Sequence, residues 1–243
     1  ILITALVACW LVLTPARLTS IVRNQAPNFI SCEFEIEQAD ITLFKSFPKL
    51  GLKIDDVTLI NPMDGSPSDT LAYINECIVS VDIKKFLKED KVVIDECRLN
   101  GGYVNLFINE SGQTNLDIFP PSEPDTIEES AELYSIDLAL LKFNEVSLNY
   151  TDLTQGMLAN IDGFDMMAKG KMKGNTLTGN VNMSLRSINY KQATDSLTMA
   201  VILHDLKMGG KAEMIGDNVN ADIELSSSKM TFESEGQTAD FAS

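Results

Sequence analysis

The residues able to do acid–base, nucleophilic or metal chemistry are present in this chain, but their spacing does not assemble a site. His204 is the only histidine and falls on the polar side of an alternating segment, which leaves no Ser-His or Cys-His arrangement. The 35 acidic residues lie mainly at alternating outward positions or in turns, unlike a glycosidase carboxylate pair. Metal-ligand spacing is also absent. The sequence therefore predicts that the protein is not an enzyme and has no metal site or cofactor.

Two cysteines are the remaining candidates for chemistry. Cys77 and Cys97 lie at equal distances from a predicted turn near Leu87, so they are expected on neighbouring strands. In an oxidising compartment they could form a disulfide, whereas two buried free thiols would act as small apolar side chains. Cys32 has no evident partner. Both interpretations of the Cys77 and Cys97 pair stay open.

Length and charge limit the kinds of partner. A chain of 243 residues can form one large β domain or two modules. Its 35 acidic and 19 basic residues give a formal charge of −16. Such a charge opposes nucleic-acid binding and provides no polybasic hold on an anionic membrane surface. No nucleic-acid partner is therefore expected.

The N-terminal segment predicts an association with a membrane. Residues 1–13 (ILITALVACWLVL) are uncharged and almost wholly apolar, as in a signal-peptide core or part of a membrane span. Because the segment starts without an initiator Met, we interpret residues 1–14 as a truncated membrane anchor. The alternative is a lipoprotein processing site with Cys9 lipidated, although the apolar run continues past Trp10.

A short amphipathic helix is expected over residues 15–30. Thr14 and Pro15 suit the N-cap and the first helical position, and apolar residues follow at helical spacing. Such a helix could lie on a membrane surface, or it could be a connector that caps the end of a sheet.

The rest of the chain alternates as β-strands do. We expect a first β module over residues 31–120, an acidic and proline-rich linker over 121–133, and a second β module over 134–243. In the first module the apolar set shifts from odd to even positions at Gly101-Gly102. A bulge that re-aims the strand explains this shift.

The second module contains an internal repeat. Apolar residues alternate from Phe164 to a turn at Gly174-Asn175 and away again to Leu185, as in a long hairpin with one apolar face. The same pattern recurs from Leu206 to Leu225, at a constant offset of 42 residues. Met157, Ala159 and Ile161 belong to a strand before the first hairpin and recur with the same shift. Repeats of this length indicate stacked units that each add antiparallel strands to one sheet.

An apolar sheet face must be covered, and the few short helices expected here cannot cover it. Either the sheet folds onto itself as a sandwich or barrel, or it forms a trough that contacts a foreign apolar molecule. Inward Met, Ala, Gly, Val and Leu suit variable ligands, although a sandwich core with gap-filling Met explains them too. We predict a mainly β fold, a long curved antiparallel sheet of repeated meanders that forms an apolar trough. The predicted groove residues are Val104, Leu106, Ile108, Val146, Leu148, Phe164, Met166, Ala168, Met172, Leu177, Val181, Met183, Leu206, Met208, Met214, Val219, Ile223 and Leu225.

Three segments resemble the N-terminal region of AsmA-like proteins. They are FPKLGLKIDDVTLINP (47–62), VVIDECRLNGGYVNLFINESGQTNLD (92–117) and LKFNEVSLNYTD (141–152), and they follow the anchor and a TPARLTSIV helix in the family's order. The resemblance covers about residues 14–152. It places Gly112 and Asn115 at the turn of a strand pair and Asn61-Pro62 at a strand exit. These are structural positions, and the family has no catalytic set to transfer.

The resemblance implies a protein anchored in the inner membrane of a Gram-negative bacterium, with its bulk in the periplasm. The family is similar in architecture to TamB and to chorein-type bridge-like lipid-transfer proteins, whose curved sheets form a groove for acyl chains. We therefore expect a lipid-binding or transfer protein that shields phospholipid acyl chains and contributes to outer-membrane biogenesis, with envelope proteins as further partners. The alternative is a non-catalytic periplasmic scaffold or assembly factor for outer-membrane proteins. Family members are usually much longer, so we interpret the chain as a fragment.

Overall fold

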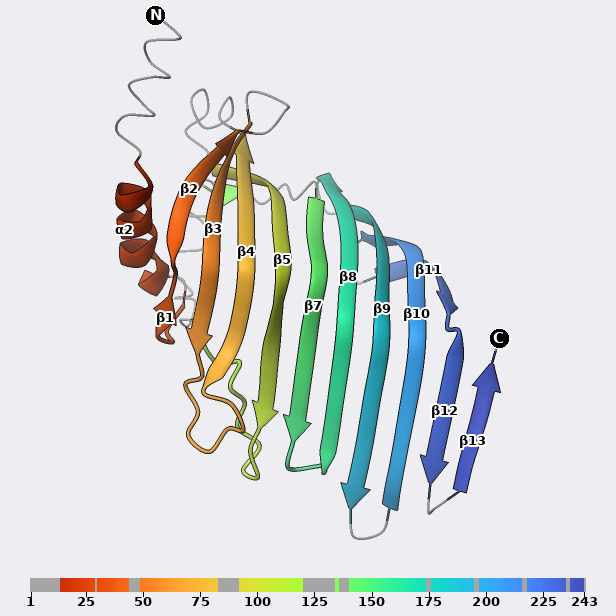
Figure 1. Cartoon of the computed structure of the whole chain (residues 1–243). Helices are drawn as coiled ribbons and strands as arrows, with labels where there is room; N and C mark the ends of the chain where they lie inside the picture. The colour runs from red at the N-terminus through yellow and green to blue at the C-terminus, as the bar shows by residue number, and fades with distance from the viewer. Residues whose placement is uncertain are drawn as a thin grey trace, which may run out of the picture.

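The alternating segments form thirteen strands of one sheet in the computed structural model (Figure 1). The structure describes residues 14–28, 30–43, 49–82, 92–119, 134–135, 140–173, 176–194, 197–215, 218–234 and 237–242. The apolar segment 1–13, the turn near Leu87 and the linker 121–133 lie outside these residues. The helical elements are α2 (Pro15–Gln25) and the 3-10 turn η1 (Ala26–Asn28). The strands are β1 (Phe34–Glu35), β2 (Gln38–Leu43), β3 (Lys49–Ile60), β4 (Thr70–Asp82), β5 (Val92–Ile108), β6 (Tyr134–Ser135), β7 (Leu140–Asp152), β8 (Met157–Lys173), β9 (Thr176–Thr194), β10 (Leu197–Ile215), β11 (Asn218–Ser226), β12 (Lys229–Ser234) and β13 (Gln237–Ala242).

The strands follow one another across the sheet nearly in chain order. The order is β1-β3-β4-β5-β7-β8-β9-β10-β12-β13, with β2 beside β3, β6 beside β5, and β11 beside β10. Within the described residues the two ends of this order do not pair with each other, so the sheet is open. The sheet also runs through the expected boundary between the two modules, because β5 pairs directly with β7.

The expectation of a wholly antiparallel sheet is wrong at β5, which pairs in parallel with both β7 and β6. A parallel pair requires a crossover connection of a dozen or more residues, and the chain between Ile108 and Leu140 is long enough to provide it. The fold is therefore mainly β with one mixed sheet, antiparallel on both sides of the β5–β7 pair.

The 42-residue repeat is present in the strand architecture. Shifting β8 by 42 residues places it within β10, and the same shift places β9 on β11 and β12 together. Both β11 and β12 pair with β10, so they lie end to end as one strand interrupted at Ser227-Ser228. One correction applies: Met157 to Ile161 is not a separate strand before the first hairpin, because β8 continues unbroken to Lys173.

A line of irregular positions crosses the sheet, and we call it the crease. At these positions the regular pairing of neighbouring strands is interrupted on β3, β4, β5, β7, β8, β9 and β10. Several of them have left-handed backbone, with φ of 50° at Asp56, 63° at Gly101, 48° at Glu145, 61° at Gly163 and 48° at Asp205. The crease consists of Asp56, Asn75, Gly101, Glu145, Gly163, Arg186 and Asp205.

At the crease, the residues that face one side of the sheet change from odd-numbered to even-numbered positions along a strand, or the reverse. Side chains alternate with a period of two, and a left-handed residue within a strand interrupts this alternation. Neighbouring strands keep the same register on both sides of the crease in every pair except β7 with β8. The apolar residues change parity at the same level, from Phe143 to Val146 on β7 and from Ile161 to Phe164 on β8. Val146 belongs to the apolar set on one side of the crease and Phe164 to the set on the other side. These two residues are direct partners, so the two sets meet on one face. The apolar residues on both sides of the crease therefore share one face. The parity change predicted at Gly101-Gly102 belongs to this line, but the predicted bulge is wrong, because β5 keeps the same register with β4 and with β7 on both sides of Gly101.

Few side chains are buried. Eleven apolar side chains of the described residues are buried, and only Val146 and Leu185 among them belong to the second module. A small apolar cluster lies at the ends of the strands in the first module. It consists of Cys32, Leu71 and Ile118, with Leu59 packed against them. The residues whose burial the structure describes thus form no single large core.

Helix α2 covers the outer edge of β2. The Thr19 hydroxyl accepts a hydrogen bond from the Ala39 backbone N–H at 2.9 Å, and the Arg23 guanidinium donates to the Ile36 carbonyl at 2.7 Å. These contacts support the connector interpretation of the helix, because they satisfy backbone groups of an edge strand. Thr14 occupies the N-cap, but its side chain makes no capping hydrogen bond. In the described part of the chain, no helix has both the length and the apolar character needed to cross a membrane.

Candidate functional site

The strand register arranges the apolar residues in continuous rows across the sheet. One row takes one residue from each strand in turn, from β3 to β11, and each residue is the direct partner of the next. Seven strand spacings of about 4.8 Å make the row roughly 34 Å long. We call it the central row; it consists of Ile54, Cys77, Leu99, Phe143, Met166, Met183, Met208 and Leu225.

Two further rows run parallel to the central row. The second row lies next to it on the side away from the crease, and the far row lies across the crease. The second row consists of Leu52, Val79, Cys97, Leu141, Ala168, Val181, Gly210 and Ile223. The far row consists of Leu59, Ala72, Val104, Leu148, Ile161, Ile188, Leu203, Met230 and Phe241.

The predicted groove residues all fall on this face by register. Met166, Met183, Met208 and Leu225 are in the central row, and Ala168, Val181 and Ile223 are in the second row. Val104 and Leu148 are in the far row, with Leu106 and Ile108 further along β5. Met172, Leu177, Met214 and Val219 are successive partners in a shorter row, Phe164 pairs with Val146, and Leu206 pairs with Leu185.

Several members of the rows were missed by the sequence prediction. Phe143 is the clearest case, since it lies in the central row between Leu99 and Met166 and its ring centre is 6.1 Å from that of Phe164. The signal was available: Leu141 and Phe143 alternate on odd positions, and Val146 and Leu148 on even ones. Only the crease at Glu145 shows that both sets face the same way.

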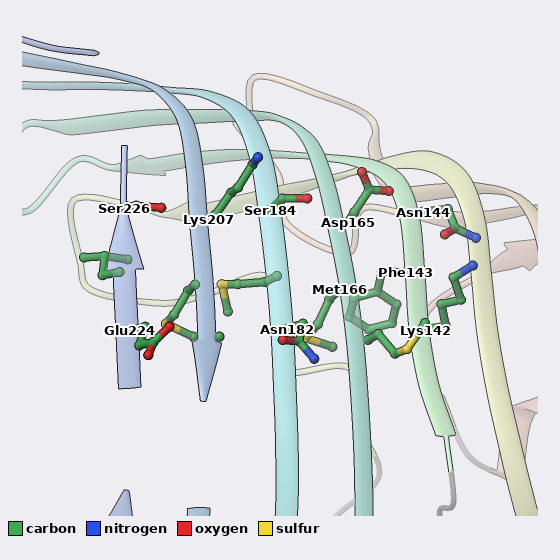
Figure 2. Close-up of a pocket in the computed structure, with 15 residues that line it drawn as sticks. Lys142, Phe143, Asn144, Asp165, Met166, Asn182, Ser184, Lys207, Glu224 and Ser226 are labelled. Atoms are coloured by element: carbon green, nitrogen blue, oxygen red, sulfur yellow. The ribbon is translucent and has the colours of Figure 1, made fainter. Parts of the chain in front are cut away.

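A groove of about 590 Å³ lies over the central row in the second module. Its apolar lining residues include Phe143, Met166, Met183, Met208 and Leu225. Polar and charged residues line it as well, among them Lys142, Asp165, Lys207 and Glu224. Figure 2 shows the strands bending over at the level of Asp165 and Ser184, with Phe143 and Met166 side by side just before the bend. The groove is therefore the concave side of the bend that accompanies the crease.

The exposure of the apolar face changes across the sheet. Val146 and Leu185 at the crease are 8% and 6% exposed, whereas Leu225 and Val219 on β11 are 67% and 63% exposed, and Phe241 on β13 is 55% exposed. Soluble proteins rarely leave large contiguous apolar patches open, and those that do usually use them to bind something. The face is thus folded inward at the crease and open towards β11 and β13.

The opposite face is polar and is tied together across the strands. Asn149 donates to Asn105 at 2.8 Å, and Asn160 donates to Asn149 at 2.7 Å, so amide side chains link β5, β7 and β8. No comparable polar chain interrupts the described part of the central row. The two faces therefore differ sharply in chemistry: one can contact water and the other cannot do so favourably.

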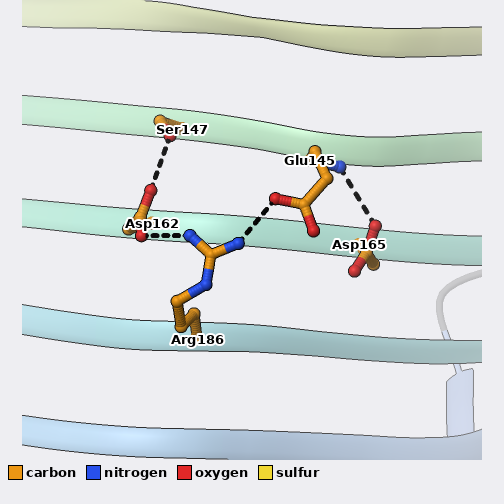
Figure 3. Close-up of polar contacts among 5 residues, drawn as sticks. All are labelled: Glu145, Ser147, Asp162, Asp165 and Arg186. Atoms are coloured by element: carbon orange, nitrogen blue, oxygen red, sulfur yellow. Dashed lines mark hydrogen bonds and ion pairs between the residues drawn. The ribbon is translucent and has the colours of Figure 1, made fainter.

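An ion-pair network holds the crease on this polar face (Figure 3). The Arg186 guanidinium lies between Asp162 at 2.5 Å and Glu145 at 2.7 Å. Its hydrogen bond lowers the pKa of Asp162. Asp165 accepts from the Glu145 backbone N–H at 3.0 Å. At Gly163, which faces Arg186, an added Cβ would lie 3.0 Å from the arginine side chain, so glycine leaves room for the network.

Two thiols are the reactive groups on the apolar face. Cys77 and Cys97 are both free and lie as diagonal neighbours on β4 and β5. The hydrogen bond from Cys77 lowers the pKa of Cys97 to about 7, and the same contact together with burial raises the pKa of Cys77. Cys32 is buried elsewhere, and desolvation raises its pKa.

Other chemistry-bearing residues stay separate. His204 is exposed on β10, and its backbone carbonyl accepts hydrogen bonds from Ser227 and Ser228. Among the described residues, no three or more His, Cys, Asp or Glu side chains are placed to hold a metal ion. The part of the chain that the structure describes offers an apolar binding surface.

Comparison with protein-family models, with curated proteins and with solved structures finds no match to this chain. What the protein does is therefore inferred from the chemistry of its own sheet: a continuous apolar face, a polar reverse face, and one thiol pair.

Proposed function

We propose that this protein binds phospholipid acyl chains along the apolar face of its sheet and shields them from water. The sheet then acts as a trough that bends at the crease, with the central row as its main contact. The observation that carries the proposal is the central row itself. It crosses eight strands without a charged side chain, and its β11 end is exposed.

Burial of hydrocarbon provides enough free energy for such binding. An acyl chain of about fifteen methylenes gains about 0.8 kcal/mol for each one buried, or roughly 12 kcal/mol in total. Association costs of about 4–15 kcal/mol offset much of this gain. The net affinity is therefore moderate, which suits a protein that must also release its lipid.

The repetition of the row suggests how a lipid would move. Met166, Met183 and Met208 are direct neighbours on β8, β9 and β10, so an acyl chain meets similar thioethers at each step. Flexible, polarisable methionine side chains adapt to a mobile ligand. An acyl chain can slide along the row at little cost, and the direction of transport must come from elsewhere.

The cellular setting of the proposal rests on the resemblance to AsmA-like proteins and on the apolar residues 1–13. We infer an inner-membrane anchor, a periplasmic trough and a contribution to outer-membrane biogenesis. Helix α2 would connect the anchor to the covered edge of the sheet.

Native mass spectrometry with lipid extraction on the full chain tests the proposal. We expect co-purified phospholipid on the wild type. Val181→Asp places a carboxylate in the second row between Ala168 and Gly210, so it should remove the lipid. Asn180→Asp is the matched control, because it adds the same charge one residue away on the exposed polar face.

The circular dichroism spectrum of each variant separates binding from folding. Loss of lipid from Val181→Asp with an unchanged spectrum, and retention by Asn180→Asp, supports the proposal. A well-folded wild type that carries no lipid and takes none up from phospholipid vesicles would contradict it.

A second candidate function, a scaffold that binds outer-membrane proteins by strand addition, is favoured by strand β11. All nine residues of β11 are exposed, and within the described residues it pairs only with β10. An unpaired strand edge can accept an extended peptide through backbone hydrogen bonds. This function predicts a lipid-free protein that binds unfolded outer-membrane strands, and Val181→Asp would leave that binding unchanged.

A further inference from the structure

The thiol pair lies on neighbouring strands of the apolar face. Cys77 on β4 is the direct partner of Leu99, and Cys97 on β5 is the direct partner of Val79. The two cysteines are therefore diagonal neighbours, offset by two residues, and they belong to the central and second rows. The sequence prediction of cross-strand neighbours holds, although the residues are not directly opposite each other.

Contact between the thiols makes them a pair. They are diagonal neighbours in the register and each shifts the pKa of the other, whereas Cys32 packs with Leu71 and Ile118 at the strand ends. Both Cys77 and Cys97 are only partly buried. A small-molecule reagent can reach them without unfolding the sheet.

We propose that Cys77 and Cys97 are a redox-active dithiol that closes reversibly to a cross-strand disulfide. This proposal concerns a modification site and does not depend on lipid binding.

The oxidant is a disulfide, either a small molecule such as oxidised glutathione or a protein disulfide. The Cys97 thiolate attacks one sulfur of the oxidant, forms a mixed disulfide and releases the first thiolate. Cys77 then loses its proton to water and attacks Sγ of Cys97, which forms the Cys77–Cys97 bond and releases the second thiolate. Two electrons pass from the cysteine pair to the oxidant. The lowered pKa of Cys97 makes it the attacking group, because the thiolate is the nucleophile.

The diagonal placement explains why the bond would be reversible. In a regular antiparallel sheet, such neighbours have Cα atoms about 7–8 Å apart, beyond the separation of up to about 6.8 Å that disulfides usually span. Closure therefore has to draw β4 and β5 together locally. Pairing irregularities on both sides of the cysteines, at the crease and between Ser80 and Val81, allow a small shift. A strained disulfide of this kind is more easily reduced than a structural one.

The test uses the full chain with Cys9→Ser, so that only the three described cysteines remain. The protein is equilibrated with buffers of varied ratio of reduced to oxidised glutathione, quenched with acid, alkylated and mapped by mass spectrometry. We expect a linked Cys77–Cys97 peptide at oxidising ratios that disappears at reducing ratios, with Cys32 alkylated throughout.

Two variants test the order of attack. Cys77→Ser should trap glutathione on Cys97, because the resolving thiol is missing. Cys97→Ser should react much more slowly at Cys77, while Cys32→Ser, the matched control, behaves as the parent protein does. The proposal is overturned if Cys77 and Cys97 are never linked at any ratio. It is also overturned if the link forms but resists reduced glutathione, because the bond is then a structural disulfide.

Discussion

The substitution Gly102→Ala tests whether the pairing next to the crease depends on close backbone approach between β4 and β5. Gly102 has a φ of 130°, which side-chain-bearing residues rarely adopt. A Cβ at this position would lie 2.0 Å from the Tyr73 carbonyl oxygen and 2.8 Å from the Ile74 Cα atom. Both are backbone atoms of β4, so no side-chain rotation relieves the clash. The alanine protein must move β4 away from β5.

The magnitude follows from two costs. Holding a non-glycine residue in this region costs about 1–3 kcal/mol. Displacing β4 also weakens one or two backbone hydrogen bonds at about 1 kcal/mol each. We therefore expect Gly102→Ala to lower the free energy of unfolding by about 2–5 kcal/mol.

Gly112→Ala is the matched control. Gly112 has a φ of 79°, and nothing lies within 4 Å of an added Cβ, so its cost is the left-handed penalty of about 1–2 kcal/mol. Both substitutions change the unfolded chain in the same way, so this effect cancels in the comparison. Urea unfolding followed by far-ultraviolet circular dichroism measures the difference. Equal losses in the two variants would refute the reasoning, because the close approach at Gly102 would then carry no cost.

Two further predictions concern a buried carboxylate and the exposure of the apolar face. Asp152 is buried and accepts hydrogen bonds from the Thr154 hydroxyl at 2.6 Å, the Thr154 N–H at 2.8 Å and the Gln155 N–H at 3.2 Å, and these bonds lower its pKa. The stabilisation that the ionised Asp152 carboxylate gives the folded state is therefore complete above the unfolded pKa of about 3.9 and is lost as the pH falls through the lowered pKa of the folded state. Wild type and Asp152→Asn should therefore converge in melting temperature under acid. Leu185→Ala should lower the free energy of unfolding by about 2–5 kcal/mol, because Leu185 is 6% exposed. Leu225 is 67% exposed, so Leu225→Ala should lower it by less than about 1 kcal/mol in the same urea assay. Similar losses in the two variants would mean that the apolar face is covered at β11.

Residue type predicted one part of the crease but not the others. Gly101-Gly102 indicated a bulge because glycine is the usual residue for left-handed backbone. Asp56, Glu145 and Asp205 adopt the same conformation without that signal. A switch in apolar parity marks each of these positions, for example between Leu203 and Leu206. Reading the switch requires knowing that the strand continues, which alternation alone does not establish.

The direction of β7 could not be predicted either. Alternation has the same form in parallel and antiparallel strands, so the pattern from Leu140 to Asp152 contains no information about its orientation beside β5. The path of the connection decides the orientation. For the same reason, the antiparallel hairpins of the repeat were predicted correctly, because their short turns allow only one orientation.

The sequence predicted which face of the sheet Cys77 and Cys97 share, but not which residues they pair with on the neighbouring strand. Counting from the turn near Leu87 placed Cys77 opposite Cys97. The pair Val81↔Ile94 is already one residue away from that count, and the register shift between Ser80 and Val81 adds one more, so Cys77 pairs with Leu99 instead. Bulges of this kind add one residue to one strand without a distinctive sequence. The positions of residues along a sheet face are therefore less predictable than the face they occupy.

The position of the crease has a consequence for how such a chain can grow. One 42-residue repeat spans two full strands and returns to the same level of the crease, as the shift from β8 to β10 shows. A duplication of that length would lengthen the sheet by two strands, about 10 Å, without altering its cross-section. A deletion of the same length would shorten it by the same step. Evolution can therefore set the reach of the molecule by unequal recombination, independently of the surface chemistry that each repeat carries.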